Sequence, residues 1–152
     1  LHPLATEFER VADYLALMDV RMGSRLQVQL DLPDGLRDVG VPPLLLQPLV
    51  ENAIKHGLEP QVAGGRVQVR ALREGDTLVL SVHDNGAGLG NGVGDRMGDK
   101  APAAPGAACG SGFGLQQVRE RLRTLYGNRA GLELQDAIGG GTLARIHLPL
   151  NA

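Results

Sequence analysis

Several scarcities in the sequence exclude whole classes of protein. A single cysteine, Cys109, rules out an internal disulfide framework and a zinc site built from several cysteines. The 15 basic residues are offset by 17 acidic ones, which argues against a protein that binds nucleic acid directly through its phosphates. No apolar run approaches the ~20 residues that a membrane-spanning helix needs. Aromatic residues make up only 3% of the chain, and tryptophan is absent.

Glycine, by contrast, is abundant, with 22 of 152 residues. Ten of these glycines lie between Gly86 and Gly114, in a segment without helical or strand periodicity. The whole chain is 43% apolar, and 152 residues of this composition are enough to form the core of one domain. A structureless segment of this length inside a domain is typically a functional lid or a linker. We therefore expect a long mobile loop here.

Hydrophobic periodicity in the flanking segments predicts helices and strands in alternation. Helical spacing predicts helices over 4–22, 42–57 and 115–127, and Pro48 inside the second predicts a kink or a restarted first turn. Apolar–polar alternation predicts strands over 26–32, 67–71, 78–82, 132–134 and 142–148. Strands joined by hairpins beside helices indicate an α+β two-layer sandwich and not a doubly wound parallel sheet.

The end of the second predicted helix carries the first candidate site. Asn52, Lys55 and His56 stand at positions i, i+3 and i+4, which share one face of an α-helix. An amide oxygen, an ammonium and an imidazole on one face could serve a metal–phosphate group. The alternative is a solvated last turn, in which the lysine and histidine only complement the helix dipole.

Three glycine-containing segments form the other candidates. Asp84-Asn85-Gly86-Ala87-Gly88 follows a strand; it is either a plain turn or a place where backbone approaches a flat ligand and Asp84 accepts a hydrogen bond from an exocyclic amine. Residues 110–115, Gly-Ser-Gly-Phe-Gly-Leu, lead into a helix; they form either a phosphate site or a lid hinge. Residues 139–142, Gly-Gly-Gly-Thr, are either an ordinary hairpin turn or the support of a bound base through Thr142.

In this order, the four segments resemble the motif boxes of the nucleotide-binding fold shared by gyrase, the heat-shock chaperone, histidine kinases and MutL, the GHKL or Bergerat fold. Residues 42–57, from Pro42 to Gly57, and residues 112–122 resemble the catalytic domain of LytS/YehU/AlgZ-type sensor histidine kinases. The helix with Glu7, Tyr14 and Arg21 resembles the segment that precedes this domain in that family. The resemblance implies a mixed, mostly antiparallel sheet covered on one face by helices.

The resemblance also implies domains and ligands. Residues 1–23 would lead out of a phosphoacceptor region, and residues 24–152 would form the ATP-binding domain, with a lid at about 87–111. ATP and Mg²⁺ would be the cofactors, with Asn52 as the metal ligand and Asp84 as the carboxylate that recognises the adenine amino group. Glu51 would either polarise the nucleophile or only hold the helix end. The other implied nucleotide contacts are Lys55 and His56 at the phosphates, Gly86 and Gly88 beside the base, Gly110, Gly112, Gly114 and Leu115 on the phosphate side of the lid, and Thr142 on the adenine side.

One departure from the superfamily pattern bears on the reaction. Members that hydrolyse ATP carry a glutamate four residues before the asparagine, and this chain has Pro48 there. This difference favours phosphoryl transfer to a protein over rapid hydrolysis. The family's acceptor histidine lies in an upstream segment that His2 does not match. His83 ends a predicted strand and His147 alternates within one, so we expect the acceptor outside this chain.

The resemblance therefore implies an ATP-dependent protein-histidine kinase domain. Its partners would be its own phosphoacceptor domain, a response regulator of the LytTR type and a second copy of the full-length kinase. It would be the cytoplasmic domain of a bacterial sensor that is membrane-anchored through another region. The alternatives are an ATP-sensing or interaction domain without transfer activity and an anti-sigma-type serine kinase of the same fold.

Overall fold

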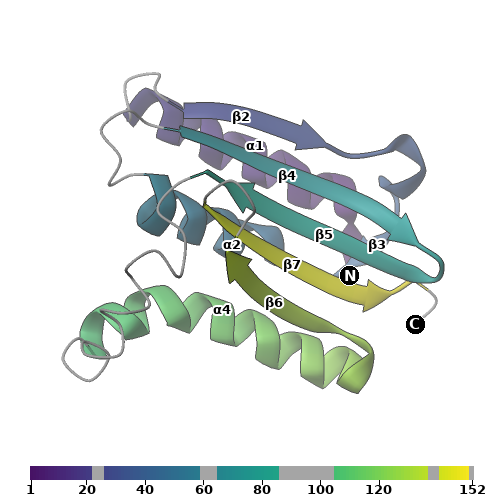
Figure 1. Ribbon diagram of the computed structural model, residues 1–152. Helices are drawn as coiled ribbons and strands as arrows, with labels where there is room; N and C mark the ends of the chain where they lie inside the picture. The colour runs from purple at the N-terminus through teal and green to yellow at the C-terminus, as the bar shows by residue number, and fades with distance from the viewer. Residues whose placement is uncertain (22–25, 59–64, 86–104, 137–140, 151–152) are drawn as a thin grey trace.

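Helices and strands form two layers in the computed structural model, which describes residues 1–21, 26–58, 65–85, 105–136 and 141–150 (Figure 1). The elements are β1 (His2–Pro3), α1 (Leu4–Arg21), β2 (Leu26–Asp31), β3 (Gly40–Val41), α2 (Leu46–Asn52), β4 (Gly65–Glu74), β5 (Thr77–Asp84), α4 (Pro105–Tyr126), β6 (Gly131–Asp136) and β7 (Thr142–Pro149). α2 continues into a π-helical turn over Ala53–Leu58, and short 3₁₀ turns cover Asp34–Leu36 and Gly127–Arg129.

The main sheet has five strands in the order β2-β4-β5-β7-β6. β2 pairs with β4 in parallel, and the other three pairings are antiparallel. This arrangement confirms the mixed, mostly antiparallel sheet. β1 and β3 form a separate two-stranded pair, which the periodicity analysis missed because two residues are too few to show alternation.

One face of the sheet is apolar and covered by the helices, and the other is polar. Alternate residues on β4, β5 and β7 point into the core, as strand period 2 requires. The buried set from the strands is Val67, Val69, Ala71, Leu78, Leu80, Val82, Ala144, Ile146 and Leu148. The helices contribute Leu4, Phe8, Val11, Leu15, Leu49, Ile54, Leu115, Val118 and Leu122 to the same core. Within the described residues, no helix combines the length and apolar content needed to cross a bilayer.

α2 begins later than its proline-rich start predicted. The expected helix over 42–57 begins only at Leu46, and its α-helical part ends at Asn52. Leu44 causes the delay, because its φ of 59° lies in the left-handed region and breaks the helical path. Pro48 is the third residue of the helix, so its missing N–H falls in the first turn, where no partner is required. Of the expected alternatives, a kink or a restarted first turn, the structure shows neither in a running helix; the helix begins two residues before Pro48.

α4 begins earlier than predicted, which corrects the expected loop up to Gly114. The helix starts at Pro105, so Gly110, Gly112 and Gly114 lie within it and not in a turn before it. A proline is well suited to a helix start, because its missing N–H has no partner there anyway. Each glycine in a helix interior costs about 1 kcal/mol relative to alanine, so the glycine-rich composition did not predict a helix here. The packing of the buried C-terminal half of α4 stabilises the helix despite this cost.

Candidate functional site

Asp84, the predicted adenine-recognising carboxylate, is the last residue of β5 and only 3% exposed. Its direct neighbour on β7 is Thr142, the first residue of that strand. Directly paired residues on antiparallel strands have Cβ atoms roughly 4.5–5.5 Å apart. The sheet therefore brings together two candidate residues that lie far apart in the sequence.

Gly141 fits closely against the backbone beside Asp84. Its φ of +89° is one that only glycine adopts without strain. A Cβ atom built there would overlap the carbonyl oxygen of Asp84 and lie 2.6 Å from its carbonyl carbon and 2.7 Å from the Cα of Asn85. In the Gly-Gly-Gly-Thr segment, Gly141 therefore does more than form a turn, because only glycine allows this close approach to the Asp84 backbone. Gly139 and Gly140 lie outside the described residues.

Asn85 holds the chain in place immediately after Asp84. Its Oδ1 accepts a hydrogen bond from the Arg66 backbone N–H at 2.8 Å, and its own N–H donates to the Arg66 carbonyl at 3.2 Å. These two bonds extend the β4–β5 pairing by one residue. The backbone around Asp84 is therefore fixed on both sides, by Arg66 of β4 and by Gly141 before β7. Gly86 and Gly88, the next candidates, lie outside the described residues.

α2 ends at the same end of the molecule as β5, whose last residue is Asp84 (Figure 1). Its π-helical continuation contacts β4 and β5. Glu51 and Asn52 are half-buried, and Lys55 is exposed. The Gln47 side-chain amide donates a hydrogen bond to Glu51 Oε2 at 3.0 Å, which orients that carboxylate.

The π-helical turn changes the expected alignment of these side chains. Helical spacing predicts that Asn52, Lys55 and His56 share one face of an α-helix, but the α-helical path ends at Asn52. A π turn closes its hydrogen bonds from i to i+5, so residues three and four apart no longer lie directly above one another. Single π turns inside helices occur frequently at functional sites.

The lid-side candidates lie on α4. A Cβ added at Gly114 would lie 3.9 Å from Pro48 Cβ, so α4 passes close to the first turn of α2. Leu115 is 4% exposed and belongs to the core, which makes it a packing residue in this structure. Gly110 and Gly112 lie on the same helix, before Gly114. Part of the expected lid, residues 87–104, lies outside the described residues.

Glu7 positions the start of α2 through contacts that the sequence did not predict. It is a carboxylate of α1, only 2% exposed, and it accepts hydrogen bonds from three consecutive backbone N–H groups at the start of α2. These donors are Leu44 to Oε2 at 2.9 Å, and Leu45 and Leu46 to Oε1 at 2.8 and 3.0 Å. His2 Nε2 also lies 2.7 Å from Oε2. The available signal was its spacing, because Glu7 lies between Leu4 and Val11 on the apolar face of α1.

Arg121 of α4 holds the same loop from its carbonyl side. Its guanidinium donates to the carbonyl oxygen of Pro43 and, at 3.4 Å, to that of Leu44. Glu7 thus binds the N–H groups and Arg121 the carbonyl groups of one short loop, residues 43–46. We call these two side chains together the α2 loop clamp. The clamp keeps Leu44 in its left-handed conformation and positions the helix that ends in Asn52.

Comparison with known proteins identifies the family to which this arrangement belongs. The profile of the histidine kinase-, DNA gyrase B- and HSP90-like ATPase family matches residues 43–152. The chain is 37% identical over 146 residues to the sensor histidine kinase BtsS of Escherichia coli K12, which covers 96% of this chain and 23% of BtsS. It is 34% identical over 140 residues to the sensor histidine kinase/phosphatase LytS of Staphylococcus aureus, covering 91% of this chain and 24% of LytS.

Solved structures show the same fold. The catalytic domain of histidine kinase ThkA superimposes with a TM-score of 0.69 at 12% identity, covering 97% of this chain and 92% of that one. The Acinetobacter baumannii histidine kinase AdeS superimposes with a TM-score of 0.61 at 16% identity, covering 95% and 66%. The chain spans about a quarter of the length of the curated relatives it matches. From the family match over residues 43–152, the chain belongs to the histidine kinase-, DNA gyrase B- and HSP90-like ATPases.

Proposed function

We propose that this chain is the ATP-binding catalytic domain of a sensor histidine kinase and that it transfers the γ-phosphoryl group of ATP to a histidine. The observation that carries the proposal is the buried Asp84 carboxylate paired with Thr142, at the same end of the molecule as Asn52. A buried carboxylate at a rigid strand end is suited to accept a hydrogen bond from the adenine amino group. The sequence similarity to BtsS and LytS supports the same activity.

The phosphate side of the proposed site consists of side chains at the end of α2 and glycines of the lid region. Lys55 and His56 would contact phosphate oxygens. Gly86 and Gly88 would let the backbone pass the base, and Gly110, Gly112 and Gly114 would border the phosphates.

A magnesium ion fits the donor chemistry at Asn52. Mg²⁺ prefers oxygen ligands and is usually held by one or two protein groups together with phosphate oxygens and water. When bound, such an ion neutralises charge that develops on the phosphates.

The chain's own residues would then position the reactants for an in-line displacement. A nitrogen of the acceptor imidazole attacks the γ-phosphorus, the bond to the β–γ bridging oxygen breaks, and ADP leaves. Glu51, oriented by Gln47, would accept a hydrogen bond from the other ring N–H of the acceptor. Pro48 stands where a hydrolysing relative has its base and cannot activate water, which favours transfer over hydrolysis.

The acceptor histidine is proposed to lie in a separate phosphoacceptor domain. His2 is engaged by Glu7, and His83 and His147 belong to β5 and β7. Residues 1–23 would connect that domain to the ATP-binding domain over 24–152, and α1 packs into the same core as the sheet. A response regulator, of the LytTR type, would receive the phosphoryl group. The full-length kinase would be a dimer, anchored to the membrane outside this cytoplasmic domain.

Calorimetric titration with a non-hydrolysable ATP analogue, with and without Mg²⁺, tests nucleotide binding. Asp84→Asn should abolish binding, and Asp38→Asn, an exposed aspartate elsewhere, should leave it unchanged. Transfer is then measured from γ-labelled ATP to a form of BtsS from which the region matching this chain has been deleted. Label on a BtsS histidine supports the kinase. Binding without transfer favours an ATP-sensing domain, and no binding by a folded chain refutes the proposal.

A further inference from the structure

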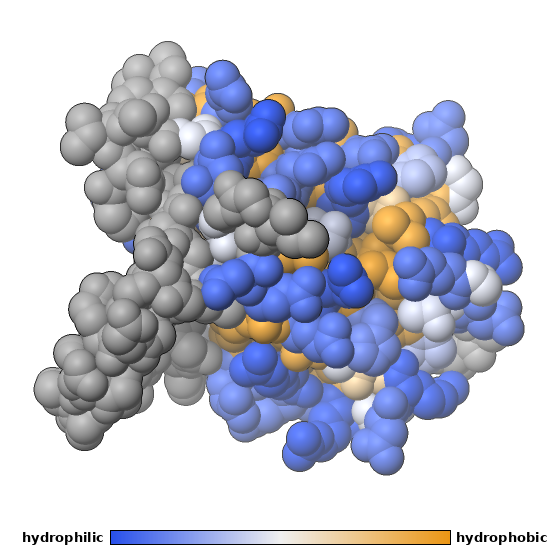
Figure 2. Space-filling view, in the orientation of Figure 1, coloured by the Kyte–Doolittle hydropathy of each residue, from blue (hydrophilic) through white to orange (hydrophobic). Residues whose placement is uncertain are grey.

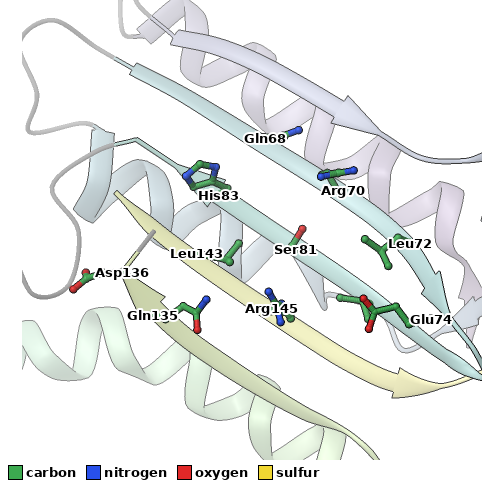
Figure 3. Close-up of a pocket in the computed structure, with 11 residues that line it drawn as sticks. Gln68, Arg70, Leu72, Glu74, Ser81, His83, Gln135, Asp136, Leu143 and Arg145 are labelled. Carbon is green, nitrogen blue, oxygen red and sulfur yellow. The ribbon is translucent and has the colours of Figure 1, made fainter. Parts of the chain in front are cut away.

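The face of the sheet without helices has a hollow of about 420 Å³ that the proposed nucleotide site does not use (Figure 3). β4, β5, β6 and β7 all contribute side chains to it. Successive residues on a strand point to opposite faces, so His83 lines the hollow while Asp84 points toward the helix layer. The space-filling view shows this face as mainly hydrophilic (Figure 2).

Strand register places two arginines symmetrically about a serine in this hollow. Arg70 of β4 is paired directly with Ser81 of β5, and Ser81 is paired directly with Arg145 of β7. Neighbouring strands are roughly 4.8 Å apart, so the two arginine Cβ atoms are separated by about 10 Å, with the hydroxyl between them. The next row along the strands contains Gln68 and His83. Figure 3 shows Arg70 and Arg145 on either side of Ser81.

The donors of this row are only partly engaged within the protein. Arg70 Nε lies 3.5 Å from Asp31 Oδ2, with both side chains half exposed, so the contact is weak and leaves the terminal nitrogens available. Within the described parts of the chain, no carboxylate lies within ion-pair distance of Arg145. His83 Nε2 is buried and has no hydrogen-bond partner there. The arginines of this row therefore lack a strong acceptor within the described parts of the chain, and His83 Nε2 is a buried nitrogen without a partner there.

Carboxylates at the borders of the hollow limit the size of the anion that can bind there. Asp31 and Glu133 stand at the two ends of the arginine row, as the neighbours of Arg70 and Arg145 in the register. Glu74 and Asp136 lie at the margins of the lining. A large polyanion would lie against these charges, whereas a small anion above Ser81 would be one strand from each arginine and two strands from Asp31 and Glu133.

We propose that this hollow, the sheet-face anion site, binds a small oxyanion that carries a phosphate or carboxylate group. The planar guanidinium presents paired N–H donors that match the oxygens of both groups, and hydrogen bonds between charged partners are the strong ones. Arg70 and Arg145 hold the anion from opposite sides, Ser81 donates from the sheet beneath it, and His83 lies in the next row of the lining.

An NMR titration of the 152-residue chain with inorganic phosphate tests the proposal, with the imidazole resonances of His83 as reporter. Ionic strength is kept constant with sodium chloride, because exposed charges are screened by salt. We expect a saturable shift that weakens about tenfold or more in Arg70→Gln/Arg145→Gln, since a hydrogen bond to a charged group contributes about 1.5–3 kcal/mol. Arg123→Gln, an exposed arginine of α4, is the matched control and should bind as the wild type does.

A second titration with succinate distinguishes the two sources of the oxyanion. Stronger binding of phosphate assigns a phosphate-bearing ligand, and stronger binding of succinate assigns a carboxylate-bearing one. The absence of a saturable His83 shift with both probes overturns the proposal. Equal affinity in the double variant also overturns it, because the phosphate would then be bound elsewhere, such as at the nucleotide site.

Discussion

Replacing Glu7 should destabilise the protein strongly, because its buried carboxylate is the acceptor for several backbone N–H groups. The carboxylate is 2% exposed and accepts three backbone N–H bonds from Leu44, Leu45 and Leu46. In Glu7→Gln, an amide oxygen in the Oε1 position retains two of these bonds. The amide nitrogen then faces the Leu44 N–H, donor against donor.

The magnitude follows from the number and type of bonds lost. One hydrogen bond to a charged group contributes about 1.5–3 kcal/mol, so Glu7→Gln should lower the free energy of unfolding by about 2–3 kcal/mol. Glu7→Ala leaves all three N–H groups without their acceptor and opens a cavity, which should cost about 3–5 kcal/mol. Leu44, at a φ of 59°, adds about 1–2 kcal/mol of backbone strain that the clamp must offset.

Urea unfolding followed by far-ultraviolet circular dichroism measures both changes. The midpoint should fall while the slope with denaturant stays constant, since the same surface is exposed on unfolding. Glu9→Gln is the matched control, an exposed glutamate on the same helix that should change stability by less than about 0.5 kcal/mol. If Glu7→Gln unfolds within 0.5 kcal/mol of the wild type, as the control is expected to, the carboxylate does not hold the loop and the reasoning is wrong.

Three further perturbations test other parts of the structure. Gly141→Ala should lower the free energy of unfolding by at least about 3 kcal/mol and abolish nucleotide binding, because the new Cβ displaces Asp84. Gly75→Ala, where φ is +63° and no atom lies near the new Cβ, should lower it by only about 1 kcal/mol. Equal losses of stability in urea unfolding would refute the close fit at Gly141. Leu44→Gly should leave stability unchanged or raise it by about 1 kcal/mol, and a clear loss would show that its left-handed conformation carries no strain. Burial raises the pKa of Tyr126, so the unfolded state loses this proton first and the free energy of unfolding falls as pH rises above about 10. Tyr126→Phe should reduce that fall, and an unchanged pH profile of stability would contradict the burial of this hydroxyl.

The elements with strong periodicity could be predicted from the sequence because local pattern determines which face is buried. Val67, Val69 and Ala71 alternate with polar residues and are buried as expected. The helical spacing in α1 likewise predicted its core face. The predicted site residues Asp84 and Thr142 followed from their motifs, but their direct pairing depends on strand order, which periodicity does not contain.

The remaining features depend on long-range contacts or on unusual composition. The Glu7 hydrogen bonds join residues 37 to 39 positions apart, so the spacing that buries Glu7 gives no indication of its partners. The start of α4 was missed because its first turns are rich in glycine and lack apolar periodicity. The π turn after Asn52 was missed because the segment carries no proline or other local signal for it.

The two halves of the proposed site are held by different kinds of contact, and this difference affects how each responds to substitution. The adenine side depends mainly on backbone: Asp84 is fixed by sheet pairing, by the Asn85 N–H bond to the Arg66 carbonyl and by the close fit of Gly141. One side-chain bond, from the Arg66 N–H to Asn85 Oδ1, adds to these contacts. The phosphate side depends on α2, whose start is held by single side chains from α1 and α4, Glu7 and Arg121. Because one loop receives both, we expect a change in the packing of α1 or α4 to act on the helix that ends in the proposed metal ligand.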